Sequence, residues 1–144
     1  MSAICLEEPP AAAYEAGAGR PKKTVLVADD DRLARGQLCA LLADEYEVLE
    51  ARDGVEALEI YERRAGRIDV VVTDYSMPRL DGVRLSELLA ARDPRLSLIM
   101  VSASVGREEM SRLFTLPKFV LLWKPFEVKV LLELVEGFVG GLEL

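Results

Sequence analysis

Runs of consecutive apolar residues, with no polar residue at alternate positions, are the feature that most constrains the fold of this chain. Val70-Val71-Val72 and Leu98-Ile99-Met100-Val101 are the clearest examples. A strand with one face in water alternates apolar and polar side chains, so unbroken runs indicate strands that are covered on both faces, as in parallel sheets. Segments with helical spacing of apolar residues separate these runs. The sequence therefore predicts an α/β fold.

The runs and the helical segments predict five β-α units in succession. Strands are expected at residues 25–28, 46–51, 70–73, 96–101 and 119–123, and helices at 32–44, 54–64, 83–92, 107–114 and 127–139. In the first helix, Ala34, Leu38, Leu41 and Leu42 are expected to share the apolar face. Right-handed crossovers between parallel strands give a doubly wound (βα)5 five-stranded sheet, which binds ligands at the carboxyl ends of its strands.

The length of 144 residues suits one domain with its own core. We expect a flexible N-terminal arm at 1–23, because this segment is rich in Ala, Gly and Pro without a sustained period, then the domain at 24–140 and a tail at 141–144. No apolar run approaches the roughly 18 residues of a membrane span, and no signal peptide is recognisable. These features predict a cytoplasmic protein without a membrane anchor.

Composition excludes several kinds of chemistry. The chain has no histidine, which removes histidine bases, Ser-His-Asp triads and histidine metal ligands. Its net charge of −7 argues against direct nucleic-acid binding over the whole domain. The two cysteines, Cys5 and Cys39, form neither a disulfide framework nor a zinc site, and Cys39 is expected in the core.

Polar residues follow four of the five predicted strands. Asp29-Asp30-Asp31 comes after the first strand, Asp74 after the third, Ser102 after the fourth and Lys124 after the fifth. Two carboxylates about 4 Å apart repel by about 4 kcal/mol at an effective dielectric constant near 20, so the cluster requires a compensating cation. Carboxylate oxygens favour Mg²⁺, which commonly joins protein carboxylates to a phosphoryl group. The sequence predicts a Mg²⁺-dependent phosphoryl site.

Four motifs, in order and at characteristic spacings, resemble the receiver domain of bacterial two-component response regulators over about residues 24–140. They are Val25 to Asp31, Val72 to Gly82 with its Met77-Pro78 and Asp81-Gly82, then Val101-Ser102-Ala103, and Lys124-Pro125-Phe126. The resemblance implies flavodoxin-like strand order 2-1-3-4-5. It also implies a domain that takes a phosphoryl group from a sensor histidine kinase or phosphotransfer protein and switches a surface for a downstream protein or output domain.

The resemblance also implies a role for each matching residue. Asp74 would be the phosphoacceptor, and Asp30, Asp74 and the main-chain carbonyl of Ser76 would bind Mg²⁺, with Asp29 acting through water. Ser102, beside Ala103, would hydrogen-bond a phosphoryl oxygen. Lys124 would pair with Asp74 and later with the phosphoryl group, and Pro125 would follow a cis peptide bond. No catalytic activity beyond self-phosphorylation and self-dephosphorylation is expected.

The chain departs from the family pattern in two places. The family usually has an aromatic ring three residues before its Lys, where this chain has Leu121, so the aromatic part of the switch is absent. Thr115-Leu116-Pro117 replaces the usual Gly-Ala turn and is expected to shorten the fourth helix. Ser76 and Ser104 occupy the positions that influence phosphoryl lifetime in similar domains.

Two other functions fit parts of the sequence. A receiver-like interaction module would act without phosphorylation, although such modules normally lose part of the acidic set, which is complete here. A haloacid-dehalogenase-like phosphatase would use Asp29, Asp31, Ser102 and Lys124, but no Asp follows Lys124 and Asp74 would stay unused.

The last predicted helix has more apolar residues than one core-facing stripe needs. One stripe is Leu131, Leu134 and Phe138. A second has heptad-like spacing and consists of Val128, Leu132, Val135, Val139 and Leu142. We expect the second stripe to contact a partner, either a second copy of this chain or a helix of a target protein. The alternative is one broad stripe covered by the fourth helix or the N-terminal arm.

No output domain is recognisable before the end at Leu144.

Overall fold

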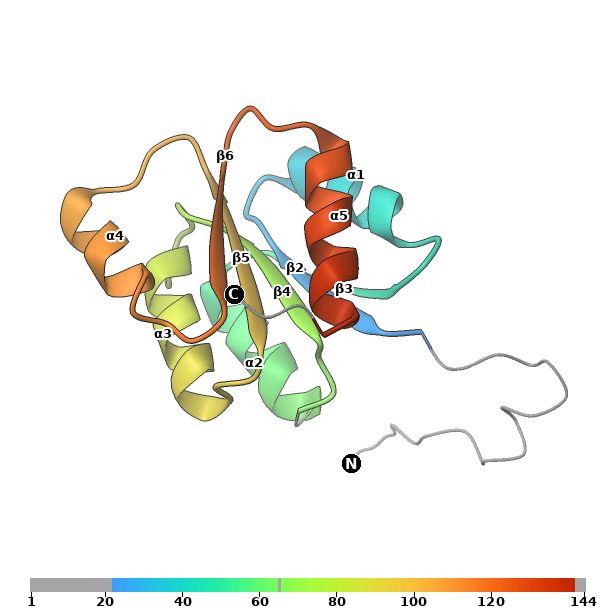
Figure 1. Ribbon diagram of the computed structural model, residues 1–144, viewed down its shortest axis with the longest axis horizontal. Coiled ribbons are helices and arrows are strands. Elements are labelled where there is room, and N and C mark those ends of the chain that lie inside the picture. Colours follow the sequence, from blue (N-terminus) through green and yellow to red (C-terminus); the bar gives the residue numbers. More distant parts are fainter. Residues whose placement is uncertain (1–21, 65, 142–144) are drawn as a thin grey trace, which may run out of the picture.

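The computed structural model, which describes residues 22–64 and 66–141, is a parallel five-stranded sheet flanked by five helices (Figure 1). The strands are β2 (Thr24–Ala28), β3 (Glu47–Ala51), β4 (Val70–Asp74), β5 (Ser97–Ser102) and β6 (Phe119–Trp123). The helices are α1 (Arg32–Leu42), α2 (Gly54–Arg64), α3 (Gly82–Arg92), α4 (Arg107–Leu113) and α5 (Val128–Val139). The sheet order is β3-β2-β4-β5-β6, which confirms the doubly wound fold and the 2-1-3-4-5 order.

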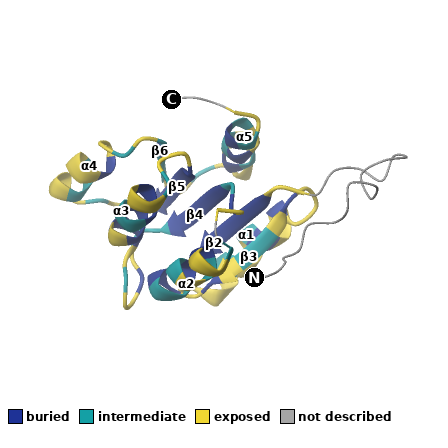
Figure 2. Ribbon diagram, turned by 90° about the horizontal axis from the view of Figure 1, so that it is seen from below, coloured by how far each residue is buried: buried dark blue, intermediate teal, exposed yellow. Residues whose placement is uncertain are grey.

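The helices form one layer on each face of the sheet (Figure 1). Successive residues of each strand point to opposite faces, so Val25 and Val27 pack with α1 and α5, whereas Leu26 and Ala28 pack with α2, α3 and α4. Both faces are therefore apolar, and the strands lie buried at the centre (Figure 2). This double coverage explains why the apolar runs of the sequence do not alternate.

All ten predicted strands and helices match those of the structure to within two residues at each end. Only residues 22 and 23 of the expected arm and residue 141 of the expected tail are described, so both expectations lie almost entirely outside the described residues. The expected short fourth helix is confirmed, because α4 has seven residues and ends at Leu113, four residues before Pro117. No helix among the described residues has the length and apolar character needed to cross a membrane.

The apolar face expected for the first helix is partly wrong. Cys39 and Leu42 are the buried residues of α1, whereas Leu41 is 42% exposed. The Arg35 guanidinium donates to the Asp29 carbonyl at 2.8 Å and to the Glu50 carboxylate at 3.1 Å, which turns this side of α1 toward the sheet edge. Cys39 lies one turn further along the same side and so packs into the core.

The two stripes expected for the last helix do not exist as separate surfaces. The core-facing residues of α5 are Leu131, Val135 and Phe138, which combine both expected stripes. Their spacing of four and three residues puts them on one face of the helix. Val135, the centre of the expected heptad-like stripe, is fully buried, and Leu142 lies outside the described residues, so the prediction of a separate partner stripe through Val135 is wrong.

We expect Val135→Glu to lower the free energy of unfolding by about 4 kcal/mol or more, because it places an unpaired carboxylate in the core. Val130→Glu is the matched control on the same helix. Since Val130 is 36% exposed, this change should stay within about 0.5 kcal/mol of the wild type. Urea unfolding followed by circular dichroism measures both, and equal stability of the two variants would contradict the assignment of the core face.

Candidate functional site

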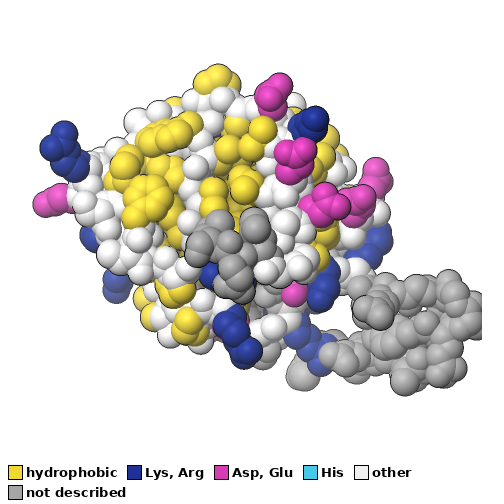
Figure 3. All heavy atoms as spheres, viewed as in Figure 1, with side chains coloured by type: hydrophobic (Ala, Val, Ile, Leu, Met, Phe, Trp, Pro, Cys, Tyr) yellow, Lys and Arg dark blue, Asp and Glu magenta, His cyan; other side chains and the backbone are white. Residues whose placement is uncertain are grey.

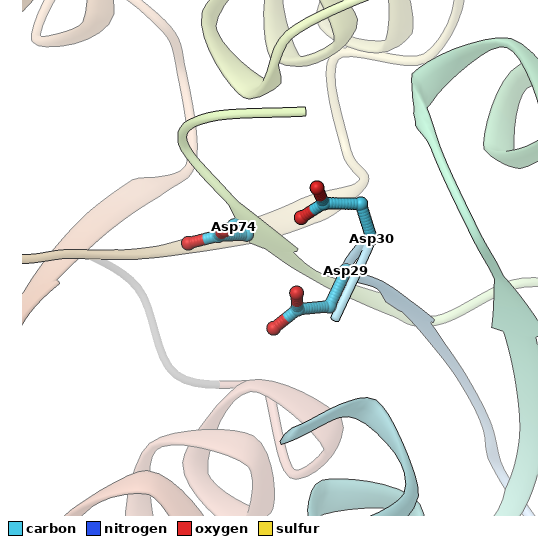
Figure 4. Close-up of side chains that lie close together, drawn as sticks. All are labelled: Asp29, Asp30 and Asp74. Atoms are coloured by element: carbon cyan, nitrogen blue, oxygen red, sulfur yellow. The ribbon is translucent and has the colours of Figure 1, made fainter. Parts of the chain in front are cut away.

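Three aspartates meet at the carboxyl ends of two neighbouring strands. Asp29 and Asp30 follow β2, and Asp74 ends β4, which pairs with β2 through Val27 and Val72. Carboxylate oxygens of all three lie within 4.8 Å of one another, and Figure 4 shows the side chains reaching toward the same space. The structure therefore brings together the acidic residues that the sequence predicted at this edge.

Asp29 is the buried member of the acidic cluster, at 5% exposure. One of its carboxylate oxygens accepts a hydrogen bond from the backbone N–H of Asp31 at 2.9 Å. Burial raises the pKa of Asp29 above its ordinary value, and the negative charges of Asp74 and Asp30 act in the same direction. The Asp31 N–H and the Lys124 ammonium oppose this rise without cancelling it. A cation near Asp29 would thus relieve a carboxylate that is costly to ionise.

Lys124 supplies the positive charge of the site. Its ammonium nitrogen lies 3.2 Å from Oδ1 of Asp74, and its backbone N–H donates to the Ser102 carbonyl at 2.8 Å. The resemblance implied a cis peptide bond before Pro125, and the Lys124–Pro125 peptide bond is cis. Three carboxylates and one ammonium leave two negative charges in the cluster, which matches the charge of a divalent cation.

The Ser102 hydroxyl is engaged within its own turn. It donates to the Ser104 carbonyl at 2.6 Å and accepts from the Ser104 N–H at 3.2 Å, while Ala103 and Ser104 are exposed. Ser102 therefore lies at the predicted strand end, and bonding to a phosphoryl oxygen would require its hydroxyl to leave this turn. Leu121 lies half-buried on β6, on the side of the sheet covered by α2, α3 and α4.

A mostly apolar cavity of about 200 Å³ adjoins the carboxylates. Asp29, Asp74 and Lys124 line its polar end. Leu38 and Leu41 of α1 line its apolar part, together with Phe126 and Val128 at the start of α5. Residues at the ends of β2 and β4 also line the cavity. The Leu41 side chain, which was expected in the core, instead borders this opening. The site is therefore reached from the side of α1 and the start of α5.

The structure also places an ion pair, which the sequence did not predict, at the same edge of the sheet. Asp53, which follows β3, is buried, and its carboxylate accepts two hydrogen bonds from the Arg79 guanidinium. The prediction that polar residues follow every strand except the second was therefore wrong, because Arg52 and Asp53 follow the second strand. The sequence signal was the Arg52-Asp53-Gly54 segment at that strand end, but nothing in the sequence paired it with Arg79, which lies 26 residues away.

Comparison with known proteins identifies the family. The model of the response regulator receiver domain matches residues 25–136. The chain belongs to this family. Receiver domains are signalling domains that interact with sensor kinases and output domains.

Individual relatives agree with the family assignment. The chain is 39% identical over 112 residues to the sensor kinase CckA of Brucella abortus and 33% identical over 112 residues to the chemotaxis protein CheY of Treponema pallidum. These alignments cover 78% and 76% of this chain. They span only 12% of the kinase but 77% of the chemotaxis protein. The solved receiver domain of the hybrid histidine kinase CckA has a TM-score of 0.68 and 32% identity, and the match covers 81% of this chain and 98% of that one.

Asp31 does not join the acidic cluster of this receiver domain. Its exposed carboxylate accepts from the Leu33 N–H at 3.2 Å and caps the start of α1. A haloacid-dehalogenase-like site would need Asp31 beside Asp29, so the geometry and the family match both oppose that alternative. Asp31 is a structural residue of the site's first loop.

We expect Asp31→Ala to lower the free energy of unfolding by about 1 kcal/mol, since it removes the cap of α1. Asp31→Asn is the matched control, because an amide oxygen caps a helix as well as a carboxylate does. Thermal unfolding of the two variants and the wild type measures the difference. An alanine variant as stable as the wild type would show that the carboxylate does not cap the helix.

Proposed function

We propose that this receiver domain accepts a phosphoryl group on Asp74 from a sensor histidine kinase or phosphotransfer protein, in a Mg²⁺-dependent reaction. The observation that carries the proposal is the convergence of Asp29, Asp30 and Asp74 at one edge, with the Lys124 ammonium 3.2 Å from Asp74. Because the phosphohistidine of such a kinase is made from ATP, we place the reaction in the cytoplasm.

The chemistry uses the Asp74 carboxylate as a nucleophile. One of its oxygens attacks phosphorus, the bond from phosphorus to the donor's imidazole nitrogen breaks, and the imidazole leaves with that electron pair and takes up a proton. Lys124 is placed to move from the carboxylate of Asp74 to the new phosphoryl oxygens. The product is an aspartyl phosphate, and water hydrolyses it to end the signal.

The residues of the cluster fit Mg²⁺. They offer hard oxygen donors, two uncompensated negative charges and no soft ligand, which is the donor set that Mg²⁺ favours. Asp30, Asp74 and the main-chain carbonyl of Ser76 would hold the ion directly, and Asp29 would hold it through water. When bound, Mg²⁺ neutralises the negative charge of the incoming phosphoryl group.

Asp74→Asn should abolish labelling. We expect incubation of the wild type with acetyl phosphate and Mg²⁺ to add one phosphoryl mass in intact-mass spectrometry, and removal of Mg²⁺ to prevent it, since the cluster would then repel the donor. Asp44→Asn, at an exposed acidic position beyond α1, is the control and should label like the wild type. Undiminished labelling of Asp74→Asn would move the acceptor elsewhere.

A failure of the wild type to label would favour the alternative function. It would indicate an interaction module that acts without phosphorylation, provided that circular dichroism shows a folded chain. The complete acidic set favours phosphorylation, because a module that acts without phosphorylation gains nothing from three carboxylates that repel one another.

The output surface is proposed on the face formed by α4, β6 and α5. Phe114, Trp123 and Val130 are exposed there by 58%, 46% and 36%, and Figure 3 shows apolar side chains gathered between α4 and α5. Trp123 directly precedes Lys124, so a shift of Lys124 toward a phosphoryl group reaches this face through one peptide unit. The proposed partner is a downstream protein, an output domain or a second copy of this chain.

We expect beryllofluoride with Mg²⁺, which mimics the phosphoryl group, to increase self-association in sedimentation velocity. Val130→Glu should abolish this increase, since it places a charge in the proposed interface. Leu33→Ser is the control, because Leu33 is 71% exposed on α1, which is not part of this surface. A monomer in both states at high concentration would exclude the homodimer and leave an external target.

A further inference from the structure

The loop between β4 and α3 carries the Ser76 carbonyl of the proposed metal site, and it is held at its far end and in its middle. At its far end, the Gly82 N–H donates to the Tyr75 carbonyl at 2.8 Å, and a Cβ atom on Gly82 would overlap the Asp74 carbonyl. In its middle, the Leu80 carbonyl lies where a Cβ atom of Gly54 would be, so the loop rests directly on the first residue of α2. The loop is thus packed between Asp74 and α2.

Arg79, within this loop, has an unusual backbone conformation for its residue type. Its φ of 70° lies in the left-handed region, and it is the one non-glycine residue with positive φ in the described part of the chain. Side chains with a Cβ atom are disfavoured there, and such conformations persist only where surrounding contacts hold them. The Leu80 N–H donates to the Pro78 carbonyl at 2.7 Å across Arg79, and the Arg79 side chain adds a second contact.

The Arg79 guanidinium makes a two-bond ion pair with Asp53. Its Nε lies 2.9 Å from Oδ2 and its Nη2 lies 3.1 Å from Oδ1. The Asp53 side chain is only 12% exposed, and it also accepts from the Glu56 N–H at 2.8 Å at the start of α2. A paired guanidinium and carboxylate with this geometry restrict both side chains more than a single contact does. Asp53 is therefore the fixed end of the pair, and Arg79 ties the loop to it.

The charges of the pair are maintained at neutral pH. Burial raises the pKa of Asp53, but the hydrogen bonds from Arg79 and from the backbone N–H of Glu56 outweigh it and lower the pKa below its ordinary value. The carboxylate is therefore ionised throughout the physiological range.

We propose that Arg79 and Asp53 are positioning residues for the metal site. Neither reaches the acidic cluster. Their ion pair holds the loop in its left-handed turn and so presets the Ser76 carbonyl beside Asp74, ready for Mg²⁺. This inference rests on the proposed function, because it assumes that the Ser76 carbonyl is a ligand. Without the pair, the loop loses its attachment to Asp53, and the ion must order the loop on binding.

The test is a comparison of Mg²⁺ dissociation constants, measured by calorimetry on the full chain. Arg79→Gly removes the guanidinium, and glycine adopts the left-handed backbone conformation without strain. Asp53→Asn removes the charge while keeping a side chain that can cap α2. We expect each to weaken Mg²⁺ binding about tenfold, which is typical of the loss of a residue that orients a metal ligand. The double variant should be no weaker than either single variant, because both remove the same ion pair.

The sign of the Arg79→Gly effect separates positioning from long-range electrostatics. If charge alone mattered, loss of the positive Arg79 would strengthen cation binding and loss of the negative Asp53 would weaken it. Positioning predicts that both changes weaken binding. Mg²⁺ affinity of Arg79→Gly equal to or higher than that of the wild type would overturn the proposal.

Arg112→Ala is the matched control variant. It breaks a similar two-bond pair, from Arg112 of α4 to Glu87 of α3 at 2.8 and 2.6 Å, which involves no residue of the loop itself. It should bind Mg²⁺ like the wild type. An equal loss of Mg²⁺ affinity in Arg112→Ala would show that the effect comes from a general loss of stability, and it would overturn the proposal. Metal-free amide hydrogen exchange gives a second readout: the amides of Ser76 and Met77 should exchange faster in Arg79→Gly and unchanged in Arg112→Ala.

The outcome for the wild type distinguishes a failure of the proposed function from a failure of the positioning role. Wild-type chain that binds Mg²⁺ and labels on Asp74, together with an unaffected Arg79→Gly, overturns the positioning role alone. Wild-type chain that binds no Mg²⁺ overturns both the proposed function and the positioning role.

Discussion

The negative charge gathered at the carboxyl ends of β2 and β4 is the constraint on which the rest of the molecule depends. Carboxylate oxygens within 4.8 Å repel one another, by about 4 kcal/mol per pair at 4 Å and an effective dielectric constant near 20. Lys124 offsets one of the three charges at 3.2 Å. Burial raises the pKa of Asp29, and the charges of Asp74 and Asp30 add to this rise. Free energy from elsewhere in the fold must hold these groups together.

That free energy comes from the sheet, which is buried on both faces. Val25 and Val27 serve one core, and Leu26 serves the other, so the strand that presents Asp29 is fixed from both sides. The register between β2 and β4 then sets the positions of the acidic residues relative to one another. A strand covered on one face only would leave its end freer to move, and the carboxylates would separate.

The loops add restraints that the strands cannot supply. Asp31 caps α1, and its N–H donates to the Asp29 carboxylate, so one residue ends the first loop and restrains the buried Asp29 side chain. On the other side, Asp53 and Arg79 join two loops that follow different strands. The site is thus held by contacts between loops, while the sheet sets only where the loops begin.

The sequence by itself determined the fold class, the residues of the acidic cluster and the place of Lys124. Apolar runs indicate strands buried on both faces, and the ends of parallel strands must share one edge, so Asp29, Asp30, Asp74 and Lys124 could be brought together without coordinates. The short α4 followed in the same way from Pro117. These features depend on local pattern and on the common direction of the strands.

Only the tertiary structure decided which side chains of each helix face the core and which loops meet. Val135 and Leu41 were assigned to the wrong surfaces, because apolar periodicity gives the width of a stripe but not the rotation of the helix against the sheet. The pairing of Asp53 with Arg79 depends on a left-handed turn and on contact across 26 residues, neither of which leaves a local trace in the sequence. Such features are set by the packing of whole elements, which no single segment encodes.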